Sequence, residues 1–196
     1  MQNLYLIRHG ESQANVDEEV YKSIPDHRIA LTDKGQTQAI FAGKELNYTL
    51  QGSTNIIHSP WLRAKQTADL IKEQLVLHKT TTLIEDPLIY EHSVLHSYED
   101  MRNKEEYYSH EKCSFGTFWY KSGTSESLAD VYTRARIFVN DLKTGRYQGD
   151  NLIIVSHGLF ISVVKGVLHN WSVQEILDMS LPNNCQILYE TISNEY

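Results

Sequence analysis

The sequence lacks the features that would place it outside the cell or in a membrane. It has two cysteines, Cys113 and Cys185, which form no CxxC pair and predict no exported disulfide framework. No apolar run approaches the roughly 18 residues that span a bilayer, and the first residues have no cationic and apolar leader. We therefore expect a cytoplasmic protein, and interpret the glycosylation sequons at 47–49 and 170–172 as chance matches.

Positive charge is also scarce. The 196 residues hold 18 lysines and arginines against 25 aspartates and glutamates, a net charge of −7. Nonspecific nucleic-acid binding requires a basic footprint, so the composition excludes that class of partner. No GxGxxG or GxxxxGK[ST] stretch predicts a nucleotide-binding loop. If the protein handles an anion, we expect it to do so in a confined pocket.

Short apolar runs alternate with helical patterns along the chain. This alternation predicts one domain over residues 1–196, a three-layer α/β/α fold with a mainly parallel central sheet. The predicted strands are 4–7, 55–58, 81–84, 151–156 and 185–192, and the predicted helices are about 33–47, 60–76, 126–143, 158–168 and a short one from 173. We expect Ser59 to cap the second helix, with Pro60 in its first turn.

Two of the predicted strands end in the same way. The first runs into Arg8, His9 and a glycine, and the strand at 151–156 runs into His157 and a glycine. Ligands of open α/β sheets bind outside the carboxyl ends of the strands, so these side chains and Arg63 can converge on one pocket. Arginine suits phosphate oxygens, and a neutral imidazole can attack phosphorus. The pattern therefore predicts a phosphoryl-binding site.

Four motifs in this order carry a family resemblance. They are RHGES at 8–12 with Asn15 shortly after, LTDKGQTQA at 31–39, SPWLRAKQTA at 59–68 and VSHG at 155–158. Together they resemble the histidine phosphatase superfamily, which includes the cofactor-dependent phosphoglycerate mutases. The resemblance implies a phosphoglycerate mutase-like fold.

The resemblance also implies a set of roles. It implies a phosphomonoesterase that passes the phosphoryl group through a phosphohistidine on His9, with neither metal nor cofactor and with a small-molecule phosphate ester as substrate. The stretch DPLIYE at 86–91 resembles the family's DPxLRE, which makes Glu91 the general acid and base. The implied phosphate-binding residues are Arg8, Asn15, Arg63, His157 and Gly158.

Some positions depart from the family pattern. Tyr90 stands where the family usually has an arginine before the acid. The stretch 92–95 stands where the family has QDFG, and Ser125 stands where the family usually has a glycine. Two alternatives therefore stay open: a phosphoglycerate mutase, and a phospho-ligand or protein-binding module with weakened catalysis. Mutases of this family are usually longer, which favours hydrolysis.

The irregular segment at about 86–123 is expected to be a lid-like insertion. Its tyrosines, phenylalanines and lysines, mostly from 92 onward, suit recognition of the leaving group at the pocket mouth. The spacing of His92 and His96, with His110 as a third ligand, is the alternative of a zinc site. No HExxH motif supports that alternative, and we expect no metal.

Overall fold

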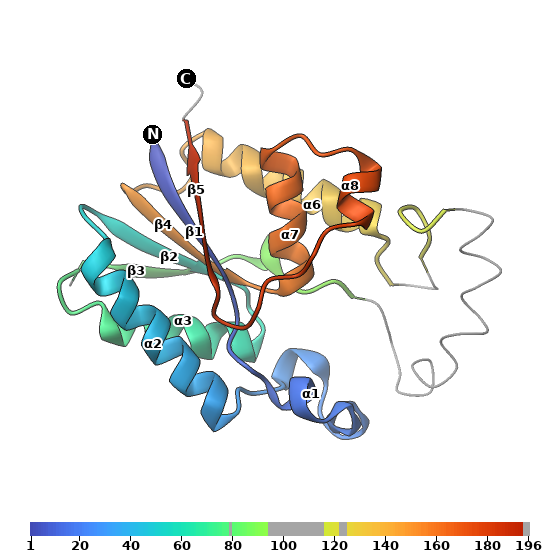
Figure 1. Ribbon diagram of the computed structural model, residues 1–196, viewed down its shortest axis with the longest axis horizontal. Helices are drawn as coiled ribbons and strands as arrows, with labels where there is room; N and C mark the ends of the chain where they lie inside the picture. Colours follow the sequence, from blue (N-terminus) through green and yellow to red (C-terminus); the bar gives the residue numbers. More distant parts are fainter. Residues whose placement is uncertain (79, 94–115, 122–124, 194–196) are drawn as a thin grey trace.

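The computed structural model describes residues 1–78, 80–93, 116–121 and 125–193. Its centre is a five-stranded sheet of order β3-β2-β4-β1-β5 (Figure 1). The strands are β1 (Gln2–Arg8), β2 (Thr54–His58), β3 (Thr82–Glu85), β4 (Asn151–Ser156) and β5 (Ile187–Ile192). The first four are parallel, and β5 pairs antiparallel with β1 at one edge. The expectation of a mainly parallel sheet is confirmed.

Helices cover both faces of this sheet, as Figure 1 shows. The long helices α2 (Asp33–Thr49) and α3 (Leu62–Gln74) pack on one face, and α6 (Leu128–Lys143) and α7 (Gly158–Leu168) cover the other. A short helix, α8 (Val173–Leu177), packs against α7. The three-layer prediction is therefore confirmed.

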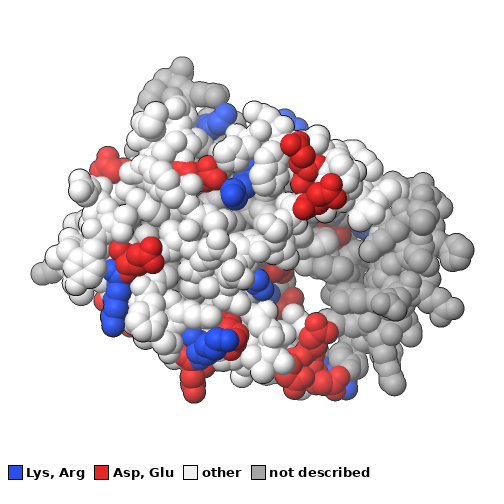
Figure 2. All heavy atoms as spheres, viewed as in Figure 1, with Lys and Arg blue, Asp and Glu red and all other residues white. Residues whose placement is uncertain are grey.

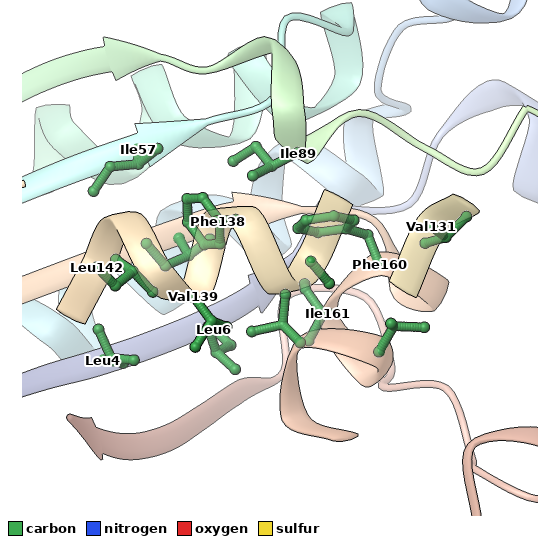
Figure 3. Close-up of a cluster of buried hydrophobic side chains, with 14 of the residues drawn as sticks. Leu4, Leu6, Ile57, Ile89, Val131, Phe138, Val139, Leu142, Phe160 and Ile161 are labelled. Atoms are coloured by element: carbon green, nitrogen blue, oxygen red, sulfur yellow. The ribbon is translucent and has the colours of Figure 1, made fainter. Parts of the chain in front are cut away.

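The alternation of side chains along β1 explains the two-sided core. Leu4 and Leu6 point into a cluster with Phe138 and other residues of α6 and α7 (Figure 3). Tyr5 and Ile7 belong to a second cluster with residues of α2 and α3. A strand that is covered on both faces needs apolar residues at every position, because successive side chains alternate between the faces. This is why β1 reads as a continuous apolar run.

The structure corrects the predicted start of α3. The helix begins at Leu62 with Trp61 at its N-cap, so Pro60 precedes the helix and Ser59 does not cap it. Ser59 is fully buried, and its hydroxyl contacts His157 instead. The prediction was wrong because a serine before a proline is compatible both with a helix cap and with a contact to the end of a neighbouring strand.

Two other differences from the prediction concern short elements. The stretch 11–30, for which no helix or strand was predicted, contains α1 (Gln13–Val16) and the 3-10 turns η1 (Glu18–Lys22) and η2 (Asp26–Arg28). The strand β5 begins at Ile187 rather than at 185. Cys185 has a φ of 54°, outside the strand region, and its N–H donates to the Arg8 carbonyl at 3.0 Å.

Part of the predicted lid lies outside the described residues. Within the segment 86–123, the structure describes 86–93, which include the 3-10 turn η3 (Pro87–Ile89), and 116–121. Phe118 is buried in the core, and Trp119 beside it is exposed. None of the helices in the described part of the chain combines the length and the apolar character needed to cross a bilayer.

Candidate active site

The two predicted histidines lie at the same edge of the sheet. Arg8 pairs with Ser156 at the ends of the parallel strands β1 and β4, so His9 and His157 follow at equivalent places. The His9 N–H donates to the Ser156 carbonyl at 2.9 Å, and the two imidazole rings are 5.2 Å apart at their centres. Both side chains are buried. The repeated strand, histidine and glycine pattern thus forms one site.

Hydrogen bonds assign the tautomer of His9. Its Nδ1 lies 2.7 Å from the Gly10 carbonyl oxygen, which can only accept, so Nδ1 carries the proton. The other nitrogen, Nε2, keeps its lone pair and accepts a bond from Nε of Arg63 at 3.2 Å. Burial, followed by the charge of Arg63, lowers the pKa of His9 well below its usual range. His9 therefore presents a neutral, unprotonated Nε2 at neutral pH.

Gly10 is required by the packing of its backbone. A Cβ atom at this position would lie 2.3 Å from the carbonyl oxygen of Gly35 in the first turn of α2. One at Gly35 would lie 2.0 Å from the carbonyl oxygen of Glu11. The absence of a side chain at Gly10 thus lets α2 approach closely. Glycines of two motifs, RHGES and LTDKG, thus support the loop that holds His9.

Two guanidinium groups flank the histidines, that of Arg63 buried and that of Arg8 half-buried. Arg63 comes from the first turn of α3, and its Nη1 donates at 2.8 Å to both the carbonyl and the carboxylate of Asp26. Arg8 donates from Nη1 to the Pro182 carbonyl at 3.0 Å, while its Nε is buried and has no hydrogen-bond partner among the described residues. A buried N–H donor without an acceptor costs free energy, so Arg8 Nε is available to donate a hydrogen bond to a ligand oxygen.

His157 has a second donor without a partner. Its Nε2 lies 2.8 Å from the Ser59 hydroxyl, which also accepts the Trp61 N–H at 3.3 Å. We assign the hydroxyl proton to the contact with Nε2, which places the imidazole proton on Nδ1. Nδ1 is buried, has no hydrogen-bond partner in the part of the chain that the structure describes, and lies 3.6 Å from a carboxylate oxygen of Glu91. Burial and the charges of His9 and Arg63 lower the pKa of His157 well below its usual range.

Glu91 is the carboxyl group that lies beside His157 in the site. Removal from water raises the pKa of its carboxyl, although the His92 N–H, at 2.9 Å, and the charge of Arg63 act in the opposite direction. A carboxyl with a raised pKa is suited to hold a proton and release it to a reacting oxygen.

The residues beside Glu91 are held by one carboxylate, that of Glu126. The Tyr90 hydroxyl donates to Glu126 Oε1 at 2.6 Å, and the Ser93 N–H donates to Oε2 at 3.2 Å. On the other side, Nε and Nη2 of Arg134 bind the same two oxygens at 2.7 and 2.9 Å. Arg134 also lies over the Tyr90 ring, 3.9 Å from its centre. The tyrosine that departs from the family pattern is therefore anchored here by its hydroxyl and its ring.

The other predicted residues lie next to this group. The Asn15 side-chain oxygen accepts the Ser12 N–H at 3.0 Å and so caps α1, and Asn184 connects it to the His9 carbonyl through bonds of 3.4 and 2.9 Å. Gly158 is the first residue of α7, and a Cβ there would lie 3.4 Å from Nε of Arg8. Gly158 therefore lies in contact distance of the Arg8 side chain, with space for a Cβ atom.

Four residues of this site were missed in the sequence: Asp26, Ser59, Glu126 and Asn184. Ser59 lies in the motif at 59–68, where its place before a proline indicated a cap, and Glu126 follows Ser125 in a stretch that resembles the family's GESxxDV. Asp26 lies in η2 and Asn184 in a turn, both far along the chain from the residues they contact, and no local pattern marks such contacts.

One group of described residues could hold a divalent cation. Ligand atoms of His9, Glu91 and His157 all lie within 4.8 Å of one another. Arg8 and Arg63 stand beside them, and two fixed positive charges favour an anion over a cation. Of the alternative zinc ligands, His96 and His110 lie outside the described residues, and His92 Nε2 pairs with the Glu126 carbonyl at 2.9 Å.

Comparison with known proteins decides the family. The profile of the histidine phosphatase superfamily (branch 1) matches residues 4–195. The chain belongs to this superfamily. It is 30% identical to a phosphoglycerate mutase-like protein of Arabidopsis thaliana, over 93% of this chain and 71% of that protein. It is 29% identical to a 2,3-bisphosphoglycerate-dependent phosphoglycerate mutase of Bartonella henselae, over 95% of this chain and 90% of the mutase.

The solved structures agree on the fold of this superfamily member. A mycobacterial glucosyl-3-phosphoglycerate phosphatase in complex with VO3 superposes with a TM-score of 0.74, at 20% identity, over 96% of this chain and 90% of the phosphatase. At that identity the likeness supports the phosphoglycerate mutase-like fold and not a shared substrate. Superfamily members similar to this chain include both phosphatases and mutases.

Proposed function

We propose that the protein is a phosphomonoesterase that hydrolyses small phosphate esters through a phosphohistidine on Nε2 of His9. One arrangement carries this proposal. A neutral imidazole, locked by Gly10, directs its lone pair into a site where Arg8 Nε and His157 Nδ1 are buried donors without partners. A tetrahedral phosphoryl group supplies the oxygen acceptors that both donors need.

The first half of the reaction forms a nitrogen–phosphorus bond. His9 Nε2 attacks phosphorus, the ester oxygen leaves, and Glu91 gives its proton to that oxygen. The attack requires Nε of Arg63 to move from the lone pair of His9 to a phosphoryl oxygen. Arg8, Arg63 and His157 then stabilise the charge that develops on the transferring oxygens.

The second half restores the enzyme. Glu91, now ionised, takes a proton from water as the water attacks phosphorus and the bond to His9 breaks. His9 leaves as a neutral imidazole, and Glu91 is protonated for the next cycle. The fixed cations provide the positive charge that metal ions supply in many phosphatases, so we propose that the reaction is metal-independent. Activity is expected to survive exhaustive chelation.

The decisive experiment is the His9→Ala variant. It is expected to lose both turnover of an aryl phosphate and formation of an acid-labile phosphoenzyme. The matched control is His169→Ala, because His169 is an exposed histidine that pairs with Glu190 at 3.0 Å, away from the site. Full turnover by His9→Ala would remove the mechanism. A wild-type protein that binds phosphate esters without turnover would indicate a binding module.

A mutase is the second candidate, and the similarity to the Bartonella henselae enzyme favours it. Mutase activity returns the phosphoryl group from His9 to a product instead of to water. Incubation of 3-phosphoglycerate with a bisphosphoglycerate primer separates the two functions. We expect inorganic phosphate rather than 2-phosphoglycerate to accumulate.

A further inference from the structure

The guanidinium of Arg63 makes hydrogen bonds both to the proposed nucleophile, His9, and to the carboxylate of Asp26. Nε donates to His9 Nε2 at 3.2 Å, and Nη1 donates to Asp26 Oδ1 at 2.8 Å. The Arg63 side chain is 4% exposed, whereas that of Asp26 is 37% exposed. Asp26 therefore lies on the solvent side of the guanidinium, and an ester bound with its phosphate at His9 would extend its non-phosphate part toward solvent.

The negative charge of Asp26 also affects the pKa of other groups near the site. It is among the causes that raise the pKa of Glu91, after burial. It also follows burial in raising the pKa of Tyr21 to about 12, with smaller effects from Arg63, Glu91 and Glu18. Tyr21 therefore lies within reach of the charges of the site. Figure 2 shows acidic side chains gathered over the segment that contains α1.

The charged side chains around His9 leave little positive charge to bind a second anion. Arg8 and Arg63 contribute two positive charges and Asp26 one negative charge, so these three groups sum to +1. A phosphoryl dianion already exceeds this sum, while Glu91 must be protonated to act as the acid. A carboxylate or second phosphate on the leaving group would then face Asp26 while both arginines are already engaged by the phosphoryl group.

We propose that Asp26 is a specificity-determining residue that selects phosphate esters with a neutral or cationic leaving group and rejects those with an anionic one. The proposal rests on the proposed phosphatase function and narrows its substrate class. It disfavours phosphoglycerates and bisphosphates, the substrates that a mutase of this superfamily would need. Specificity here arises from repulsion of the wrong substrate as much as from attraction of the right one.

A matched pair of substrates tests the proposal. Glycerol 3-phosphate and 3-phosphoglycerate differ in one group, a hydroxymethyl against a carboxylate, while the phosphate and its ester oxygen are alike. For the wild-type protein we expect kcat/KM for glycerol 3-phosphate to exceed that for 3-phosphoglycerate roughly tenfold or more. The Asp26→Asn variant is expected to bring this ratio close to one, mainly through KM for 3-phosphoglycerate.

Two control variants separate the local charge from other effects. Asp69→Asn removes the same charge from an exposed pair with Lys65 on α3 and should keep the wild-type ratio. Asp26→Glu keeps the charge and should also keep the ratio, even if it shifts Arg63. A wild-type ratio near one, or an unchanged ratio in Asp26→Asn, would overturn the proposal.

Binding measurements make the result independent of turnover. Calorimetric titration of the His9→Ala variant with both esters, with and without Asp26→Asn, should show the same preference in Kd. If the wild-type protein hydrolyses an aryl phosphate but binds both esters equally, only the role of Asp26 is wrong. If nothing is hydrolysed but the preference in Kd persists, the phosphatase function is wrong and the selectivity of the pocket stands.

Discussion

The hydroxyl oxygen of Ser59 lies 2.8 Å from Nε2 of His157, although 98 residues separate the two along the chain. The contact joins the end of β2 to the end of β4, which are neighbours in the sheet. It fixes which nitrogen of His157 carries the proton, and so decides whether Nδ1 is a donor or an acceptor toward a phosphoryl oxygen.

Removal of that hydroxyl should therefore impair catalysis. Ser59→Ala is expected to lower kcat by about tenfold, because part of the His157 population would shift its proton to Nε2. Nitrogen chemical shifts of the imidazole would report the change of tautomer directly. Ser162→Ala is the matched control, since this serine donates to the Ser180 carbonyl at 3.0 Å, elsewhere in the fold. A wild-type tautomer in Ser59→Ala would show that other groups orient His157.

Glu91→Gln should discriminate between leaving groups. An alkoxide needs a proton to depart, whereas an acidic phenolate does not, so the variant should slow alkyl phosphates far more than aryl phosphates. The ratio of the two kcat values is the quantity to measure. Equal losses on both substrates would assign Glu91 a positioning role.

Tyr90→Phe should produce a weaker form of the same effect. The variant removes the 2.6 Å bond to Glu126, while Arg134 still satisfies that carboxylate. We expect a loss of stability of about 1 kcal/mol and a decrease in kcat for alkyl phosphates that exceeds the decrease for aryl phosphates. Tyr189→Phe, which removes a surface bond to Asn3, is the control. Uniform losses in Tyr90→Phe would mean that the Glu126 contacts stabilise the fold without positioning Glu91.

Stability should fall as the pH drops below about 6.5. Burial lowers the pKa of His9 and His157 from an ordinary value of 6.5, so the unfolded chain binds protons that the folded chain does not. Each histidine can contribute up to about 1.4 kcal/mol per pH unit below 6.5, until its folded pKa is reached. The slope of the unfolding free energy between pH 7 and 5, measured in urea, should decrease in His157→Ala.

Glu91 acts in the opposite direction over part of this range. Its folded pKa is raised above 4.5, so its contribution to stability is present below that value and is lost as the pH rises through the folded pKa. The Glu91→Gln variant should therefore steepen the dependence on pH. A slope unchanged in both variants would show that these groups titrate alike in the folded and unfolded chain.

The sequence predicted the parts of the site that depend on local pattern. The strand, histidine and glycine pattern placed His9 and His157 correctly, because parallel strands with short connections leave few alternatives for their ends. Asp26, Ser59 and Glu126 act through contacts across 37, 98 and 36 residues. Such contacts depend on how whole elements pack, and a capping pattern at Ser59 even indicated a different use.

The place of β1 in the sheet has a consequence for how the protein is made. Its two neighbours are β4 and β5, and Asn3 meets its partner Asn151 across 148 residues. During synthesis β1, which His9 follows, emerges before both of its partners, and its backbone edges stay unpaired until β4 and β5 have been made. Pairing across such a distance is slow and exposes the chain to aggregation. A ribosome-stalled chain that ends before β4 is therefore expected to be retained by chaperones and to form no phosphoenzyme.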